Sequence, residues 1–153
     1  SKPIAEHFDE NVFWSGLTYS GHAMSLAAGV AAVEVMRDEG LVEHAAHMQS
    51  VMLDHMRQLA DKHPSVASYR ATGLFGAIEM QKNAQGEPLS GYNETHPAVA
   101  KFIKTLLAKG VFTLSHWNMI FCNPPLCITE EQLAETFAVV DECLQITDDA
   151  YEG

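Results

Sequence analysis

Positive charge is scarce in this chain. Nine lysine and arginine residues stand against 20 aspartate and glutamate residues, which gives a formal net charge of -11 at pH 7. The basic residues form no cluster that would neutralise a run of phosphates. The composition therefore argues against a nucleic acid as partner.

Cysteines are few, and none of them is placed for pairing. Cys122, Cys127 and Cys143 are odd in number and lack the Cys-x-x-Cys spacing, so neither a disulfide framework nor a cysteine zinc site is indicated. We expect three small buried side chains in a reducing, cytoplasmic environment.

The pattern of a membrane span or of a leader is also missing. Residues 11–33 carry no Asp, Glu, Lys or Arg, but polar residues in the first half of this stretch argue against a bilayer-spanning helix. The opening SKPIAEHFDE lacks the basic region and apolar stretch of a signal peptide. No membrane partner is expected.

What the chain does have is enough apolar residues, 47% of 153, to build a hydrophobic core. Residues 20–37 are rich in alanine around Gly29 and predict a helix that is buried by close approach of other backbone. A second helix is predicted over 41–63, ended by Pro64. Its apolar stripe, with spacings of three and four residues, consists of Leu41, Ala45, Met48, Met52, Met56 and Leu59.

The second half of the chain alternates short strands with helices. The segment VASYRATGLFGAIEM, residues 66–80, predicts strand, turn and strand around a Thr-Gly break. Further predicted elements are a helix over 97–109, short strands over 111–115 and 118–123, and a last helix that opens on a capping box at residues 129–132. The predicted fold is α+β, or a piece of an α/β fold, with a small sheet covered by helices.

Hydroxyls and glycines gather just before the alanine-rich helix, in the segment GLTYSGH. Thr18 and Ser20 lie where helix N–H groups are unpaired and the helix dipole is positive, which favours an anion such as phosphate. The alternative is that Ser20 only caps the helix. Because His22 rather than lysine follows the second glycine, the segment is not a P-loop, and nucleoside triphosphates are disfavoured.

Three other features have both a functional and a structural interpretation. His44, His47 and His55 share one flank of the second helix at a spacing that allows a metal, but no carboxylate pattern accompanies them and a solvated flank is favoured. Arg70 either binds a carboxylate or holds a loop by hydrogen bonds. The acidic pair at 148–149 is assigned to a solvated tail without an acid–base role.

Four segments together carry a family resemblance. They are GLTYSGH before the alanine-rich helix, VASYRATGLFGAIEM, AKGVFT, and NPPLCITEEQL before the last helix. In this order and at these separations the chain resembles the class III pyridoxal-phosphate-dependent aminotransferases of fold type I over essentially its whole length. The first and last segments are most similar to the branch of taurine–pyruvate and other ω-amino acid or amine–pyruvate aminotransferases.

The resemblance implies the C-terminal part of a longer, homodimeric enzyme. Residues 1–38 would then end the large cofactor-binding domain with its buried helix, residues 39–64 would form the connecting helix, and residues 65–153 the small C-terminal domain that closes over substrate. In the family, the threonine that matches Thr18 contacts the phosphate of the cofactor bound by the other subunit. Leu17 matches a position that helps to wall the partner's substrate pocket.

The chemistry of the family depends on a lysine that forms a Schiff base with pyridoxal 5'-phosphate and on an aspartate that pairs with its pyridine nitrogen. The resemblance places both motifs upstream of Ser1. The six lysines of this chain, at positions 2, 62, 82, 101, 104 and 109, all lie outside the family's lysine motif. The chain by itself is therefore expected to have no catalytic residue and no transaminase activity.

Many relatives bind a substrate carboxylate with an arginine beside the position of Phe121 or around residues 114–116, and this chain has no arginine there. In its place we expect His116 to supply a weaker, pH-dependent positive charge and Trp117 an apolar wall. Ala71 stands where the family usually has glycine after the arginine. This difference indicates a different turn and bears on whether Arg70 binds substrate.

The leading interpretation is an aminotransferase that moves an amino group from an amine or ω-amino acid, such as taurine or β-alanine, to pyruvate. The rival is a non-catalytic packing or dimerisation module left by truncation. A third interpretation, a phosphate-binding domain unrelated to transamination, rests on residues 18–21 alone and is disfavoured.

Overall fold

The computed structural model describes every residue from Ser1 to Gly153. The chain divides into two compact units, Ser1–Glu39 and Gly40–Gly153. None of the helices is both long enough and apolar enough to cross a membrane.

The first unit consists of two helices joined by an extended segment and a turn. Helix α1 spans Lys2–Glu10 and helix α2 spans Ala23–Asp38, and neither buries a single residue. The expectation that the alanine-rich helix is buried is therefore wrong for this chain on its own. Its small side chains suit close packing, but the unit contains no second layer of structure for α2 to pack against.

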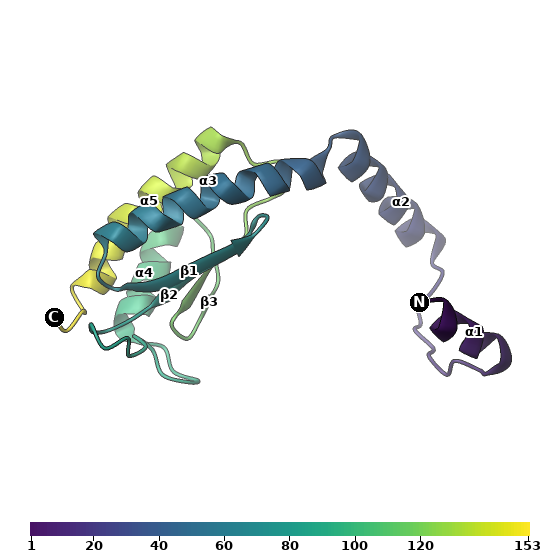
Figure 1. The fold of residues 1–153 in the computed structure, drawn as a ribbon, viewed down its shortest axis with the longest axis horizontal. Helices are drawn as coiled ribbons and strands as arrows, with labels where there is room; N and C mark the ends of the chain where they lie inside the picture. Colours follow the sequence, from purple (N-terminus) through teal and green to yellow (C-terminus); the bar gives the residue numbers. More distant parts are fainter. The chain divides into compact units, whose positions relative to one another are not determined.

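The second unit is built on a four-stranded antiparallel sheet with the strand order β1-β2-β4-β3 (Figure 1). The strands are β1 Val66–Thr72, β2 Phe75–Met80, β3 Ser115–His116 and β4 Met119–Cys122. The predicted hairpin of β1 and β2 is confirmed, and it turns at Gly73, whose φ of 56° favours glycine. The Gly73 amide donates a hydrogen bond to Gln49 Oε1 at 2.7 Å, which ties the hairpin to the preceding helix.

Three helices pack over one face of this sheet, and Figure 1 shows two of them, α3 and α5, side by side. Their bounds are α3 Leu41–Lys62, α4 Pro97–Ala108 and α5 Glu130–Asp148. The predicted stripe of α3 is confirmed at its centre, where the buried residues are Met48, Met52, Met56 and Leu59. The predicted apolar positions of α5 are also buried, namely Leu133, Phe137, Val140 and Leu144.

The register of the sheet decides which side chains the helices cover, because alternate residues of a strand point to opposite faces. Ile78 pairs with Ile120, and both side chains are buried in the core. Glu79, one residue further along, pairs with Met119, which in turn pairs with His116. This second row lies on the face that the helices leave open, where side chains remain accessible.

The first of the two short strands predicted after α4 is much shorter than expected. Only Ser115 and His116 pair as a strand, so the prediction for 111–115 is largely wrong. Upstream of them the side chain of Thr113 donates to the backbone carbonyl of Phe121, and this contact takes the place of a ladder hydrogen bond.

The prediction of a solvated acidic pair at the end of the chain is wrong for Asp148, whereas Asp149 is exposed. Helix α5 continues to Asp148, whose mostly buried carboxylate is hydrogen-bonded to His63 and Ser65. A carboxylate this far from solvent needs such donors, since burying an unpaired charge is costly. The sequence gives no sign of the contact because the partners are more than 80 residues apart.

The three cysteines differ in exposure. Cys143 is buried and Cys122 is half-buried, but Cys127 is exposed, so the expectation of three buried side chains is wrong for Cys127. Burial raises the pKa of the Cys122 thiol to about 12, which keeps it protonated at neutral pH.

The capping box of α5 is confirmed and offers a test of the fold. Thr129 Oγ1 accepts from the Gln132 amide at 3.2 Å, and the Thr129 amide donates to Gln132 Oε1 at 3.1 Å. We expect Thr129→Ala to lower the free energy of unfolding in urea by about 1 kcal/mol. Thr136→Ala in the interior of the same helix is the control, with a change below about 0.5 kcal/mol. Equal losses in both variants would contradict the capping role.

Candidate functional site

A turn at residues 17–21 precedes helix α2. It carries Thr18 and Leu17, which the sequence analysis assigns to the cofactor phosphate and to the wall of the substrate pocket. The Ser20 amide donates to the Leu17 carbonyl at 2.9 Å, and Gly21 closes the turn with a φ of 77°. The side chain of Thr18 is exposed, and that of Leu17 is 74% exposed. Both side chains are therefore free to meet another surface.

Ser20 does not cap α2, so the alternative interpretation of this residue is wrong. The helix begins only at Ala23, because the turn that Gly21 closes must end before helical dihedral angles can start. The N-cap is His22, whose Nδ1 accepts from the Ser25 amide at 3.4 Å. The hydroxyls of Thr18 and Ser20 are thus not used to cap the helix.

Arg70 lies on β1, on the open face of the sheet. Its Nη1 donates to Glu79 Oε1 at 2.6 Å, and Ser68 Oγ donates to Glu79 Oε2 at 2.9 Å. The Arg70 guanidinium, and after it the Ser68 hydroxyl, holds the pKa of Glu79 below its usual range. This geometry favours the structural interpretation of Arg70, because a substrate carboxylate would have to compete with Glu79.

His116 and Trp117 lie at the tip of the β3–β4 hairpin with their ring centroids 4.1 Å apart. Tyr92, in the loop between β2 and α4, joins them with its ring 4.5 Å from that of Trp117. Sequence analysis missed Tyr92, since a lone aromatic in a loop has no periodicity. Trp117 has a φ of 57°, a left-handed conformation that costs a non-glycine residue roughly 1–2 kcal/mol.

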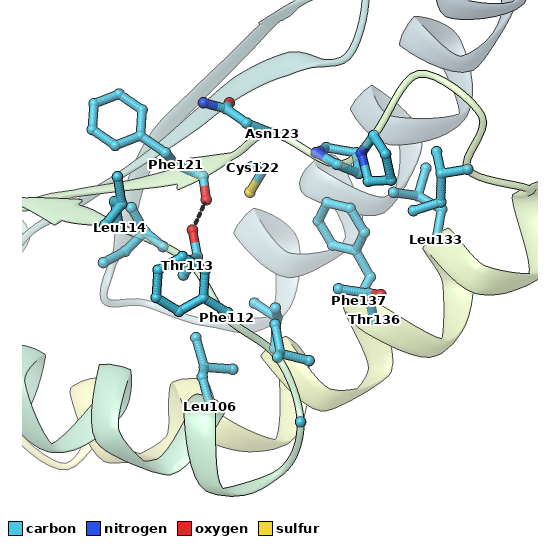
Figure 2. A pocket seen from close by; sticks show the side chains of 17 residues that line it. Leu106, Phe112, Thr113, Leu114, Phe121, Cys122, Asn123, Leu133, Thr136 and Phe137 are labelled. Carbon is cyan, nitrogen blue, oxygen red and sulfur yellow. Dashed lines mark hydrogen bonds between the residues drawn. The ribbon is translucent and has the colours of Figure 1, made fainter.

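Leu114 and Phe121 lie at the two stretches where the family resemblance places a substrate-binding arginine, and they are adjacent in space. The Phe121 amide donates to the Leu114 carbonyl at 3.0 Å. Figure 2 shows both side chains on one side of a pocket of about 380 Å³, with Leu133 and Phe137 on the other. The polar side chains that line this pocket are Thr113, Asn123, Thr136 and the thiol of Cys122, and none is charged. A pocket of this kind does not attract a second carboxylate.

The three histidines on the flank of α3 all have protein partners. Nε2 of His44 lies 2.8 Å from a backbone carbonyl just before α5, and Nε2 of His47 lies 2.8 Å from Glu130 Oε1. The ring of His55 stacks on that of Phe137 with centroids 5.2 Å apart. The flank therefore joins α3 to the α5 side of the unit, and no three His, Cys, Asp or Glu side chains are grouped to hold a metal.

The five residues that the sequence nominates as a site divide between the two units. Two belong to the first unit and three to the second: Thr18 and Leu17, then Arg70, His116 and Trp117. Within the second unit, Met119 connects two of them. Its Sδ lies 3.5 Å from Arg70 Nη2, and it pairs with His116 across the strands.

Solved structures resemble this chain along nearly its whole length. A taurine:2-oxoglutarate aminotransferase from Bifidobacterium kashiwanohense, in complex with PLP and glutamate, has a TM-score of 0.92 and 33% identity. A transaminase from the marine bacterium Virgibacillus has a TM-score of 0.86 and 29% identity. Each match covers 97% of this chain, but only 34% and 35% of the respective relative. The fold is that of the C-terminal portion of a fold type I aminotransferase.

The family follows from the sequence comparison. The model of the aminotransferase class-III family matches residues 2–144, and the chain belongs to this family. Ornithine aminotransferase 1 of Staphylococcus aureus is 30% identical over 83% of the chain, and isoleucine 2-epimerase of Lentilactobacillus buchneri is 32% identical over 88%. The chain spans 28% and 27% of these two proteins. The predicted family and fold are thus confirmed.

The pairing of Arg70 with Glu79 can be tested by titration. We expect Arg70→Gln to raise the pKa of Glu79 toward its ordinary value, and Ser68→Ala to raise it less, because the arginine is the larger cause. A lowered carboxyl pKa contributes stability at neutral pH that is lost as the pH falls through the folded value. The difference in stability between Arg70→Gln and the wild type should therefore shrink in acid. Carboxyl carbon shifts in NMR report the pKa, and a larger effect of Ser68→Ala would refute this order.

The effect of the backbone strain at Trp117 can be separated from that of its ring contacts with two variants. Trp117→Ala and Trp117→Gly both lose the contacts with Tyr92 and His116, but only glycine adopts a positive φ without strain. We expect the glycine variant to be more stable than the alanine variant by about 1 kcal/mol in urea unfolding. Equal stability of the two would show that the turn relaxes.

Proposed function

We propose that this chain is the C-terminal part of a pyridoxal-phosphate-dependent aminotransferase that moves an amino group from an amine or ω-amino acid, such as taurine or β-alanine, to pyruvate. The observation that carries the proposal is the match to the taurine:2-oxoglutarate aminotransferase, with 33% identity over 97% of the chain. Since the chain spans only about a third of that relative, the activity is that of a longer polypeptide.

The names of the curated relatives describe more than one type of reaction. Besides the ornithine aminotransferase and the isoleucine 2-epimerase, an ethanolamine-phosphate phospho-lyase homolog of Caenorhabditis elegans is 29% identical over 84% of the chain. These names describe amino-group transfer, epimerisation and elimination. The two solved structures that are 33% and 29% identical to this chain are both transaminases, and this favours amino-group transfer.

The acceptor is inferred from charge. The relative with bound PLP takes 2-oxoglutarate, a dicarboxylate, whereas pyruvate carries one carboxylate. In this chain no arginine stands beside Phe121 or at residues 114–116, and the charge of Arg70 is balanced by Glu79. A second carboxylate would find no free guanidinium among these residues, so a monocarboxylate acceptor is favoured.

The first unit fits the phosphate end of the cofactor. Thr18 presents an exposed hydroxyl in a turn directly before a helix, a setting suited to an anion. We assign Thr18 to donate a hydrogen bond to the phosphate bound by the second subunit of a homodimer, and Leu17 to shield that subunit's substrate from water. Pyridoxal phosphate, when bound, supplies the electrophilic carbonyl and electron sink that the transfer needs.

The second unit is assigned to the substrate side. On its open face His116 offers a pH-dependent positive charge near a carboxylate, and Trp117 with Tyr92 offers an apolar wall. The lysines do not serve as covalent anchor: those at 2, 62, 82 and 109 are paired with carboxylates, and those at 101 and 104 are exposed on α4. The anchor must come from another part of the polypeptide.

The role of Thr18 can be tested in the complete enzyme. A hydrogen bond to a charged group contributes about 1.5–3 kcal/mol, so Thr18→Ala should weaken binding of pyridoxal phosphate roughly 10- to 100-fold. Binding is measured by the absorbance of the bound cofactor in titrations. Ser15→Ala, an exposed hydroxyl outside the turn, is the matched control and should leave the affinity unchanged.

Mixed dimers test whether Thr18 acts across the interface. In the mixed dimer one subunit carries Thr18→Ala, and the other keeps Thr18 but lacks the cofactor lysine. If Thr18 acts across the interface, the subunit with the lysine receives an intact threonine and one site is complete. If Thr18 acts within its own subunit, neither site is complete. We expect the mixed dimer to keep about half of the wild-type activity with taurine and pyruvate.

A different outcome in the complete protein would support the rival interpretation. If it showed no activity with any amine and with either pyruvate or 2-oxoglutarate, and bound no cofactor, it would be a non-catalytic module.

A further inference from the structure

A buried polar cluster lies at the end of the second unit, where α3 ends, β1 begins and α5 ends. At its centre is His63, which is only 3% exposed. Its Nδ1 lies 2.6 Å from Asp148 Oδ2, and its Nε2 lies 3.0 Å from Asp141 Oδ1. One imidazole therefore bridges two carboxylates that lie about two turns apart on α5.

Both carboxylates have further donors on their second oxygen. Asp141 Oδ2 accepts from the Lys62 ammonium, and this pairing, as the largest cause, holds the pKa of Asp141 below its usual range. Asp148 Oδ1 accepts from the Ser65 amide at 3.2 Å and from its hydroxyl at 2.6 Å. Donors on the second oxygen favour the charged form of each carboxyl group.

The count of protons then decides the state of the ring. An ionised carboxylate only accepts hydrogen bonds, and a neutral imidazole carries a single N–H donor. Two contacts of 2.6 and 3.0 Å to ionised oxygens therefore require a proton on each ring nitrogen. The charges balance in the same way, because Lys62 and a doubly protonated His63 match Asp141 and Asp148.

We propose that His63 is held as an imidazolium at neutral pH and acts as a pH-sensitive latch that fastens the α3–β1 corner to α5. The charged groups that face it are Asp141 and Asp148 from α5 and, through Asp141, Lys62 from α3. This inference does not depend on the proposed transaminase activity.

The folded state requires the doubly protonated form of His63, and this determines how stability changes with pH. While both ring protons are held, the latch contributes stability. As the pH rises and one proton leaves, one carboxylate loses its donor while it remains mostly shielded from water, and the stability is lost. In acid the latch weakens as well, because Asp141 must then take up a proton.

The cluster is not a hydrolase triad, although it contains Ser, His and Asp. The hydroxyl of Ser65 contacts Asp148 and Thr147 but not His63, and Ser65 is completely buried. A nucleophile needs a base within hydrogen-bond reach and access to substrate, and Ser65 has neither. Its part here is to hold Asp148.

The proton count can be read directly by NMR of the nitrogen-labelled chain. We expect both ring nitrogens of His63 to remain protonated at pH 8. His47, which contacts a single exposed carboxylate, that of Glu130, between the same two helices, serves as internal control. Asp148→Asn keeps the shape of the side chain but removes its charge, so one ring nitrogen of His63 should be deprotonated at pH 8 in this variant.

Thermal unfolding gives the second readout. We expect the melting temperature of the wild type to fall as the pH rises above 8, with a smaller fall in His63→Gln and in Asp148→Asn. If Asp148→Asn does not fold, Asp141→Asn is the milder substitution, because Asp141 is the more exposed of the two carboxylates. A single protonated ring nitrogen in the wild type at pH 8, or equal pH profiles for the wild type and His63→Gln, would overturn the proposal.

Discussion

Packing of the helices on a single face of the small sheet is the constraint from which the rest of the second unit follows. Burial of Ile78, Ile120 and the methionines of α3 gives the unit its core. Because side chains alternate along a strand, the same burial directs Arg70 and Glu79 to the opposite face. The residues that can meet a ligand are therefore fixed by the positions of those that form the core.

The open face has a balance of charge that bears on chemistry. Its arginine is matched by a glutamate within the sheet, and the residues that line the nearby pocket, Leu114 and Phe121 among them, carry no charge. Relatives of this family act on substrates as different as ornithine and isoleucine, as their names say. Such breadth is possible when a fold keeps its cofactor machinery and varies a few side chains around it.

Periodicity and local chemistry were enough to predict most of the second unit. The stripe of α3, the Thr-Gly hairpin and the capping box of α5 each depend on residues close in sequence, and all three are present. The strand predicted over 111–115 failed because a side chain, that of Thr113, replaces a backbone partner. A local sequence pattern does not reveal that a side chain takes the place of a backbone hydrogen-bond partner.

The site could be predicted only in part, for a related reason. Thr18 and Leu17 were nominated through a family resemblance, whereas Tyr92 and His63 depend on contacts with residues distant in sequence. Asp148 seemed to belong to an acidic tail because its partners, His63 and Ser65, lie in the distant connection between α3 and β1. Charges that are neutralised by tertiary contacts cannot be told from solvated ones by composition.

Helix α2 places 16 residues in a helix and buries none of their side chains, although Leu26, Val30 and Val33 are apolar. A helix of this length is marginal in water, and most helical stability in proteins comes from packing an apolar face. Folding of α2 and its association with a covering surface are therefore linked in one equilibrium. If that surface belongs to a second copy, as in the proposed homodimer, dilution would release the turn that carries Thr18 while the core of the second unit stays intact. The proposed contact between Thr18 and the cofactor phosphate would then depend on the concentration of subunits.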